Sequence, residues 1–302
     1  MRARVLGSAA GGGVPQWNCA CDNCRLARAG DARVRARTQD SIVVQSGDRD
    51  RWLLINASPD VLRQIEQFDA LWPRARRSTP IAAIALTNGD LDHVLGLLSL
   101  RESQPLRVLA TPRVRVGLVG QNVMFRTLAR TPDQVAWTDL APGREVVLDE
   151  VGIGVTPLAV PGKLPVHLAG SSEPSPEDNV ALRIRDLAGA GGVIFVGTAI
   201  GALAGVDALV QGADAIFFDG TFWSGDELIA QGLGRARARD MAHVPIGGDD
   251  GSLARLSRVT SVRKIYTHVN NTNPILCDGS AERRAVEQAG WEVGFDGLEV
   301  SL

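Results

Sequence analysis

Residues 81–93 read Ile-Ala-Ala-Ile-Ala-Leu-Thr-Asn-Gly-Asp-Leu-Asp-His and are the segment most informative about the architecture of this chain. The apolar residues that open the segment predict a buried strand. Asp90, Asp92 and His93 follow that strand directly, and the apolar residues 94–100 favour a helix. A strand that ends in oxygen and nitrogen donors before a helix places those donors at a sheet edge, where sites tend to form. The segment therefore predicts a metal-binding loop at the edge of a sheet.

Short apolar segments recur along the chain and predict β-strands separated by helices. The strand candidates are residues 4–6, 41–44, 52–55, 81–86, 107–110, 146–148, 153–158, 180–184, 193–196, 215–218, 264–267 and 291–295. Helical patterns fall at residues 59–68, 95–101, 113–128, 203–211, 226–231, 251–256 and 280–289. The first half is hairpin-like and the second half adds crossover units, so we expect a mixed sheet arrangement. No shift in composition marks a boundary, and we predict a single domain over residues 1–302.

The composition indicates a sizeable core without a strong charge bias. Apolar residues make up 45% of the 302 residues, and the formal net charge is −2. This charge gives no basic patch for nucleic acid or for an anionic membrane. No apolar run approaches the roughly 20 residues that a membrane-spanning helix needs. The N-terminus also lacks the apolar segment of a secretory signal, so we predict a cytoplasmic protein without nucleic-acid or membrane partners.

Three of the four cysteines, Cys19, Cys21 and Cys24, lie close together in the sequence. In a reducing compartment such clustering favours a metal over disulfides. Thiolates suit tetrahedral zinc, and a structural zinc site needs four ligands. The candidates for the fourth ligand are Cys277, Asn271 and a histidine, and the alternative interpretation is three free thiols in a turn. We predict a structural zinc that connects the N-terminal loop to a distant segment.

Histidine is scarce in this chain, with 4 residues, and two of them end predicted strands. These are His93 and His268, and a polar run at residues 270–274 follows the second. Two strand-end histidines with the carboxylate of Asp92, and with Asp90 as an extra ligand, predict a mononuclear metal centre. The alternative is that the Asp-His pair only caps a helix and that the histidine is satisfied by its neighbours.

Two further residues are candidates for the chemistry of this centre. His243 follows the basic segment 235–239 and is a candidate proton donor or substrate contact, or else a satisfied surface or core histidine. Asp219 is a third strand-end acid, which either lines the site or caps a turn. His167 is most economically a surface residue. The glycine-rich residues 7–13 do not match a dinucleotide-binding fingerprint and predict a turn.

Five stretches together resemble the coenzyme pyrroloquinoline quinone (PQQ) synthesis protein B family of the metallo-β-lactamase superfamily. They are residues 6–19, 56–60, 86–93, 218–221 and 268–274. The resemblance covers nearly the whole chain, and its first and last stretches are long and specific. It implies an α/β (α+β) fold, an αββα sandwich of two mixed β-sheets flanked by helices, with metals at strand ends between the sheets.

Hydrolytic members of this superfamily carry an HxHxDH loop, which aligns on residues 88–93. Asn88 and Asp90 replace its first two histidines. A later histidine of those enzymes falls near residues 162–163, and their metal-bridging aspartate falls on Thr198. A two-metal hydrolytic centre needs ligands for both ions, and one set is missing here.

The surviving ligands, Asp92, His93 and His268, match the arrangement of two histidines and one carboxylate found in non-haem iron oxygenases. The resemblance implies the same chemistry, an iron(II)- and O2-dependent hydroxylation of a tyrosine-derived intermediate in PQQ biosynthesis. We therefore expect Fe(II) at this centre, a separate structural Zn(II) at the cysteines, and O2 and a small-molecule or dipeptide precursor of PQQ as partners. His243 and Asp219 are expected to orient the substrate or to move protons.

The polar run after His268 has two expected roles. Asn270 and Asn273 are candidates for binding the amino-acid ends of the substrate. The cysteine cluster resembles the zinc clip of related phosphodiesterases, in which a histidine closes the site, and Asn271 stands at that place here. Two alternative functions stay open: a zinc-dependent hydrolase of phosphodiester or ester bonds, and a non-enzymatic carrier for transport of the quinone or its precursor. The sequence is compatible with a homodimer.

Overall fold

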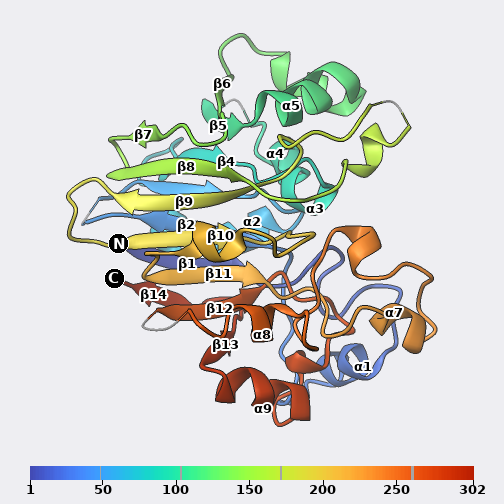
Figure 1. Cartoon of the computed structure of the whole chain (residues 1–302). Helices are drawn as coiled ribbons and strands as arrows, with labels where there is room; N and C mark the ends of the chain where they lie inside the picture. The colour runs from blue at the N-terminus through green and yellow to red at the C-terminus, as the bar shows by residue number, and fades with distance from the viewer. Residues whose placement is uncertain (48, 103, 171, 260–261) are drawn as a thin grey trace.

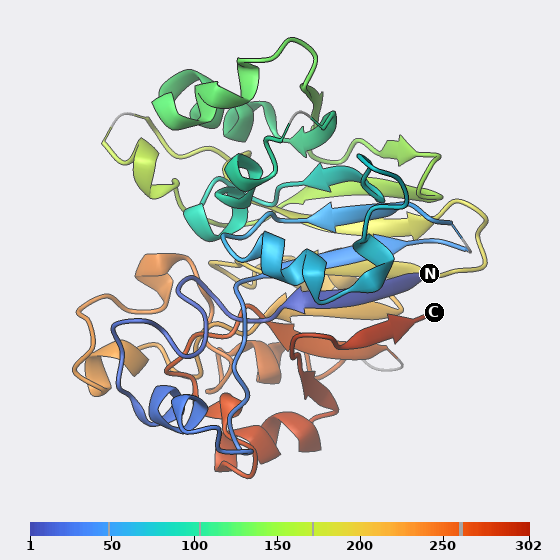
Figure 2. The same ribbon diagram turned by 180° about the vertical axis from the view of Figure 1, so that it is seen from behind.

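Two seven-stranded β-sheets lie face to face in the computed structural model, with helices outside them (Figures 1 and 2). The structure describes residues 1–47, 49–102, 104–170, 172–259 and 262–302. The predicted αββα sandwich of two mixed sheets is therefore confirmed. The single domain predicted over residues 1–302 stays a prediction.

The first sheet contains strands from the N-terminal half of the chain and one strand from its C-terminus. In spatial order they are β14 (Glu299–Ser301), β1 (Arg2–Gly7), β2 (Ser41–Gln45), β3 (Trp52–Ile55), β4 (Ile81–Ala85), β5 (Leu106–Ala110) and β6 (Val135–Asp139). Pairing is antiparallel from β14 to β3 and parallel from β3 to β6. The change follows from the connections, because parallel neighbours need a crossover that a short hairpin cannot provide.

The second sheet has the same mixture of pairings. In spatial order its strands are β13 (Trp291–Val293), β12 (Arg263–Thr267), β11 (Ala215–Asp219), β10 (Val193–Gly197), β9 (Val180–Asp186), β8 (Ile153–Ala159) and β7 (Val146–Leu148). Pairing is antiparallel from β7 to β10 and parallel from β10 to β13. The carboxyl ends of β11 and β12 therefore lie side by side, with Asp219 opposite Thr267.

The helices are short. They are α1 (Asp22–Arg28), α2 (Val61–Glu66), α3 (Leu91–Val94), α4 (Gly96–Ser99), α5 (Pro112–Arg115), α6 (Val206–Val210), α7 (Glu227–Ala230), α8 (Ser252–Arg255) and α9 (Ala281–Gln288). Figure 2 shows α2 on the outer face of the first sheet, and α9 packs its buried Val286 in the apolar cluster outside the second. Across the described ranges, no helix has the length and apolar character needed to cross a membrane.

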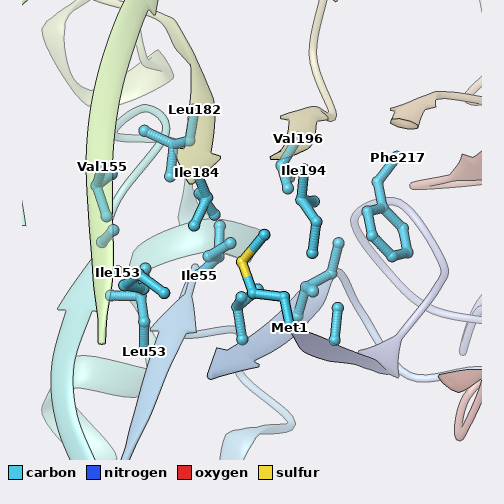
Figure 3. Close-up of a cluster of buried hydrophobic side chains, with 14 of the residues drawn as sticks. Met1, Leu53, Ile55, Ile153, Val155, Leu182, Ile184, Ile194, Val196 and Phe217 are labelled. Carbon is cyan, nitrogen blue, oxygen red and sulfur yellow. The ribbon is translucent and has the colours of Figure 1, made fainter. Parts of the chain in front are cut away.

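Apolar side chains from both sheets fill the space between them (Figure 3). Leu53 and Ile55 come from the first sheet, and Leu182, Ile184 and Phe217 come from the second. Two further clusters cover the outer faces, so most central strands are buried on both sides. This burial explains why the strands read as continuous apolar runs and not as alternating patterns.

Two strands and two helices of the described residues were not predicted from the sequence. β6 and β14 are the two edge strands of the first sheet, and the side chains of both are largely half-buried or exposed. Strands of this kind carry a weak apolar signal. The unpredicted helices are both short: α1 is mostly polar and contains Cys24, and α3 lies just before the helix predicted at residues 95–101.

The prediction of one helix over residues 113–128 is wrong. The segment divides into α5, a π-helical turn at Val116–Gln121 and a 3-10 segment at Val123–Ala129. Glycine lowers helix stability, and the π-helical turn contains Gly117 and Gly120. Asn122 then adopts an extended conformation, and its side chain accepts a hydrogen bond from the Met124 backbone, which begins the next segment.

The inter-sheet core provides a test of the packing. Replacing the fully buried Leu182 by alanine is expected to lower the free energy of unfolding by about 2–5 kcal/mol, because the cavity between two sheets cannot collapse freely. Val147 is 43% exposed on the edge strand β7, so Val147→Ala should change the free energy by less than about 0.5 kcal/mol. Urea unfolding of both variants measures the difference, and equal losses would contradict this account of the core.

Candidate metal centre

Three predicted ligands meet where the two sheets expose the carboxyl ends of their parallel strands. β4 leads through Thr87 into α3, which carries Asp92 and His93, and β12 leads directly to His268. The Asp92 Oδ2 atom lies 3.2 Å from His268 Nε2 and 3.8 Å from His93 Nε2. The ligand atoms of the three residues, one from each, all lie within 4.8 Å of one another. The structure therefore brings together Asp92 and His268, which lie 176 positions apart in the sequence.

Two backbone features lie beside this group, a left-handed residue and a close approach of a glycine. His268 has a φ of 56°, in the left-handed region that non-glycine residues rarely occupy. A Cβ atom on Gly11 would lie 3.3 Å from Asp92 Oδ2, so the glycine-rich loop packs directly beside the carboxylate. The sequence predicted only a turn there, and its role as a wall of the site was missed.

One atom of the group lacks a partner. His93 is 1% exposed, and its Nε2 atom makes no hydrogen bond within the described part of the chain. A buried polar atom without a partner costs about 1–3 kcal/mol. This lone nitrogen lies near Asp92 and His268, and imidazole nitrogens and carboxylate oxygens are common ligands of divalent metals. The donor set therefore fits a metal ion.

The electrostatics of the group favour a cation. Burial opposes the charge on His268, but its hydrogen bond to Asp92 and the carboxylates of Asp92, Asp40 and Asp219 raise its pKa to about 9. Burial also lowers the pKa of His93 to about 4. Against the effect of its own burial, the two histidines lower the pKa of Asp92 below its usual range. Several carboxylates thus together favour positive charge at one place between the sheets.

Two threonines that the sequence analysis did not single out contact the histidines. Thr87 Oγ1 lies 3.0 Å from His93 Nδ1, and Thr221 Oγ1 lies 2.9 Å from His268 Nδ1. Their only sequence signal was membership of the stretches 86–93 and 218–221. Hydrogen bonds at Nδ1 orient an imidazole ring and leave its Nε2 atom for a ligand.

Asp219 and His243, which were predicted to orient the substrate or to move protons, also lie beside the group. With His268 they form a second set of ligand atoms within 4.8 Å. However, Asp219 accepts hydrogen bonds from Ile200 N at 2.9 Å, Thr221 N at 3.1 Å and His243 Nδ1 at 2.8 Å. Protein donors therefore satisfy its oxygens, and Asp219 holds the His243 ring, which stacks on His268 with centroids 5.3 Å apart.

Asp90, the predicted extra ligand, does not join the group. Its carboxylate lies 3.4 Å from Lys163 Nζ, and its backbone N–H donates to Asn88 Oδ1. Asp90 is the residue just before α3, whereas Asp92 lies within that helix. The geometry does not support the predicted role of Asp90 in metal binding.

One position that aligns with a missing ligand of hydrolytic relatives, residue 88, carries an amide that bonds to a second amide, Asn179. Asn88 Nδ2 donates to Asn179 Oδ1 at 3.1 Å, and Asn179 Nδ2 donates to Ala199 O. A Cβ atom on Gly162 would lie only 2.4 Å from the Cβ of Asn179. These residues satisfy one another and offer no second set of imidazole or carboxylate ligands.

The two asparagines predicted to bind substrate differ in availability. Asn273 is 0% exposed, and its side chain donates to Gly220 O and accepts from Ile275 N. Its predicted substrate role is therefore contradicted, because the side chain caps a 3-10 turn. Asn270 is half-buried and donates to Thr272, and its role stays a prediction.

His167, expected at the surface, is half-buried, and burial lowers its pKa.

The three clustered cysteines form a second donor group. The Sγ atoms of Cys19, Cys21 and Cys24 lie within 4.8 Å of one another. Asn271 Nδ2 lies 3.2 Å, 3.5 Å and 3.4 Å from these three sulfurs, whereas Cys277 contacts the backbone of Asp278. Of the candidates for a fourth ligand, the structure thus brings Asn271 to the cysteines, where its amide nitrogen donates to the sulfurs, and only its Oδ1 atom could bind a metal. Burial raises the pKa of Cys21 to about 11.

Comparison with known proteins agrees with this architecture. Residues 51–269 match the family model described as a beta-lactamase superfamily domain. The crystal structure of Zn(2+)-bound PqqB from Methylobacterium extorquens superposes with a TM-score of 0.92 at 42% identity, covering 100% of both chains. A diphosphatase from the PhnP family superposes with a TM-score of 0.68 at 18% identity, over 100% of this chain and 97% of the other. That last likeness supports the fold alone.

The sequence relatives cover the chain from end to end. A protein named coenzyme PQQ synthesis protein B from Methylobacterium sp. (strain 4-46) is 46% identical over 100% of both chains. Another of the same name from Methylorubrum extorquens is 42% identical, again over 100% of both chains. The chain therefore belongs to the coenzyme PQQ synthesis protein B family, within the β-lactamase superfamily.

Proposed function

We propose that this protein acts in PQQ biosynthesis as an iron(II)- and O2-dependent hydroxylase of a tyrosine-derived intermediate. The family membership supports the pathway, because its relatives carry the name coenzyme PQQ synthesis protein B. The observation that carries the chemistry is the group formed by the half-buried Asp92 and the buried His93 and His268. Its His93 Nε2 atom has no hydrogen-bond partner among the described residues.

Asp92, His93 and His268 would hold the iron. This set supplies one carboxylate and two imidazoles, and iron(II) bound in such a set activates O2 because open coordination positions remain. Asp219 is excluded from the set because backbone and side-chain donors already occupy its oxygens. Asp90 is excluded because it pairs with Lys163.

His243 is the residue we assign to proton movement. Its Nδ1 atom donates to Asp219 at 2.8 Å, which fixes the ring and leaves Nε2 for exchange with a bound substrate. The ring stacks on His268, so it lies beside the proposed metal position. Asn270 stays a candidate for contact with the amino-acid ends of the substrate.

A zinc-dependent hydrolase of phosphodiester or ester bonds is the second candidate function. One observation favours it, namely that the solved relative with 42% identity is described as zinc-bound. The amide network of Asn88 and Asn179 argues against it, since a two-metal centre needs ligands for a second ion. A non-enzymatic carrier of the quinone or its precursor is less well supported, because a carrier has no need of open metal positions.

We assign a structural zinc to Cys19, Cys21 and Cys24, with Asn271 beside them as the candidate fourth ligand. The cysteines belong to α1 and the loop before it, whereas Asn271 follows His268. Such a zinc would therefore join the N-terminal segment to the loop that carries an iron ligand.

The expected partners, location and oligomeric state stay predictions. They are a small-molecule or dipeptide precursor of PQQ, O2, a cytoplasmic location without nucleic-acid or membrane binding, and a homodimer. The iron and the precursor follow from the proposed reaction and share its test.

Oxygen uptake tests the active-site proposal. Anaerobically purified protein should contain about one zinc and one iron per chain and should consume O2 with a dihydroxyphenyl precursor. Asp92→Asn should lower iron binding and uptake by about 10- to 100-fold or more, because it removes the charged ligand. Asp90→Asn is the matched control and should stay within about threefold of wild type.

Three results would contradict the proposal. Hydrolysis of generic phosphodiesters with zinc, together with no O2 uptake with iron, would favour the hydrolase. Equal loss in both aspartate variants would show that the ligand set is wrong. Tight quinone binding by wild type and His93→Ala alike, with turnover by neither, would favour the carrier.

Substitution of the cysteines tests the structural zinc. Cys24→Ser should lose about one zinc per chain and lower the thermal midpoint, since a structural zinc contributes directly to folding. Cys277→Ser should keep the zinc because its sulfur lies outside the cluster. Metal analysis of both variants measures the difference. Full zinc content in Cys24→Ser would overturn the assignment.

A further inference from the structure

A chain of buried hydrogen bonds leads from Asp40 to the candidate ligand His93. Asn56 Nδ2 donates to Asp40 Oδ2 at 3.0 Å, and Asn56 Oδ1 accepts from both the backbone N and the Oγ1 of Thr87, each at 3.0 Å. Thr87 Oγ1 in turn lies 3.0 Å from His93 Nδ1. All four residues are 0–1% exposed, so these contacts are shielded from bulk solvent.

The orientation of the Asn56 amide is determined by its neighbours. A backbone N–H can only donate, so the Asn56 atom that faces the Thr87 backbone must be the oxygen. The amide nitrogen then faces Asp40, whose carboxylate is an acceptor. Both contacts require the same orientation, and the opposite one would break both.

The Asn56 oxygen in turn determines the position of the Thr87 hydroxyl hydrogen. Thr87 Oγ1 carries one hydrogen and lies 3.0 Å from Asn56 Oδ1, which has none to give. If the hydrogen pointed elsewhere, two oxygens would face each other without a hydrogen between them. The hydroxyl therefore donates to Asn56 and can only accept from His93, so His93 Nδ1 must carry the hydrogen.

We propose that Asp40, Asn56 and Thr87 are positioning residues that hold His93 in the Nδ1–H tautomer and turn its Nε2 lone pair toward Asp92 and His268. The inference rests on the proposed metal centre, for which a free Nε2 lone pair is the required form of the ligand. It gives a role to the stretch 56–60, which the proposed function left without one.

The backbone around Asn56 is built to hold this chain of contacts. Asn56 has a φ of 57°, a conformation that asparagine tolerates better than most residues. Its backbone N–H donates to Ala85 O at 2.8 Å, and the next N–H, of Ala57, donates to His93 O at 2.7 Å. Asn56 is thereby attached both to β4 and to the helix that carries His93.

His268 provides an internal reference. Its Nδ1 atom also faces a threonine hydroxyl, but Thr221 Oγ1 lies within 3.1 Å of Asp219 Oδ1, the His268 carbonyl and His243 Nδ1 as well. The Thr221 hydrogen therefore has more than one acceptor. A change at Thr87 should affect His93 and leave His268 as it is.

Nitrogen-15 NMR of histidine-labelled protein that keeps its structural zinc but lacks the active-site metal tests the proposal without any assay of activity. The chain has 4 histidines, so single His→Gln variants assign every signal. Wild type and Thr87→Ser should show His93 as the Nδ1–H tautomer. Thr87→Val should show a mixed or reversed tautomer and, in a Zn2+ titration followed on the His93 signals, an affinity about 10- to 100-fold lower.

Thr111→Val is the matched control. Thr111 follows the neighbouring strand β5, is 1% exposed, and its hydroxyl donates to Glu177 O and accepts from Val114 N. Its loss should destabilise the fold without changing the His93 tautomer or the Zn2+ affinity. This control separates a general effect of removing a buried hydroxyl from a specific effect on His93.

Two results would overturn the inference: an Nε2–H tautomer of His93 in wild type, or an unchanged tautomer and Zn2+ affinity in Thr87→Val. The failure of the hydroxylase proposal is distinguishable from both. If O2 uptake is absent while tautomer and Zn2+ affinity follow the prediction, the positioning role stands and the proposed reaction fails.

Discussion

The constraint on which this structure depends is the burial of polar ligand groups between two apolar sheets. His93, His268 and Asp219 are each no more than 4% exposed, so each polar atom needs a partner from the protein or from a ligand. Thr87, Thr221 and Asn56 supply those partners on one side of the histidines. His93 Nε2 receives no partner from the residues that the structure describes, and it lies where the carboxylates concentrate negative charge. This combination is typical of a cation site, and it is independent of any comparison with relatives.

The same rule explains how the chain departs from two-metal hydrolases. Replacing an imidazole by the amide of Asn88 leaves a polar group that still has to be satisfied in a buried place. Asn88, Asn179 and the carbonyl of Ala199 satisfy one another, and Gly162 leaves room for the Asn179 side chain. The second ligand set has therefore been exchanged for a closed hydrogen-bond network. The group of Asp92, His93 and His268 keeps its ligand atoms, and it suits chemistry that needs open coordination positions on a single ion.

The cysteine cluster is mechanically connected to the metal centre through one loop. Asn23, on α1, donates from its side chain to the carbonyl oxygens of Asn271 and Asn273 at 3.0 Å and 2.9 Å. This loop begins at His268, whose φ of 56° is held by the hydrogen bonds around it. Contacts at the cysteines thus help to set the position of a histidine in the other group. The carboxyl ends of the strands carry the site, and the apolar core between the sheets supplies the stability.

The sequence by itself determined most of the architecture and the main donors. Central strands buried on both faces carry strong apolar runs, so twelve strands were located, whereas the edge strands β6 and β14 carry weak ones. Strand-end residues such as Asp92, His93 and His268 were visible because polar donors after an apolar run are distinctive. Tertiary structure alone decided which neighbours each side chain meets. It directed Asp90 to Lys163 and turned Asn273 into a cap, and it placed Asn56 and Thr87 behind His93. Such contacts join residues far apart in the chain, and local patterns of polarity contain no information about them.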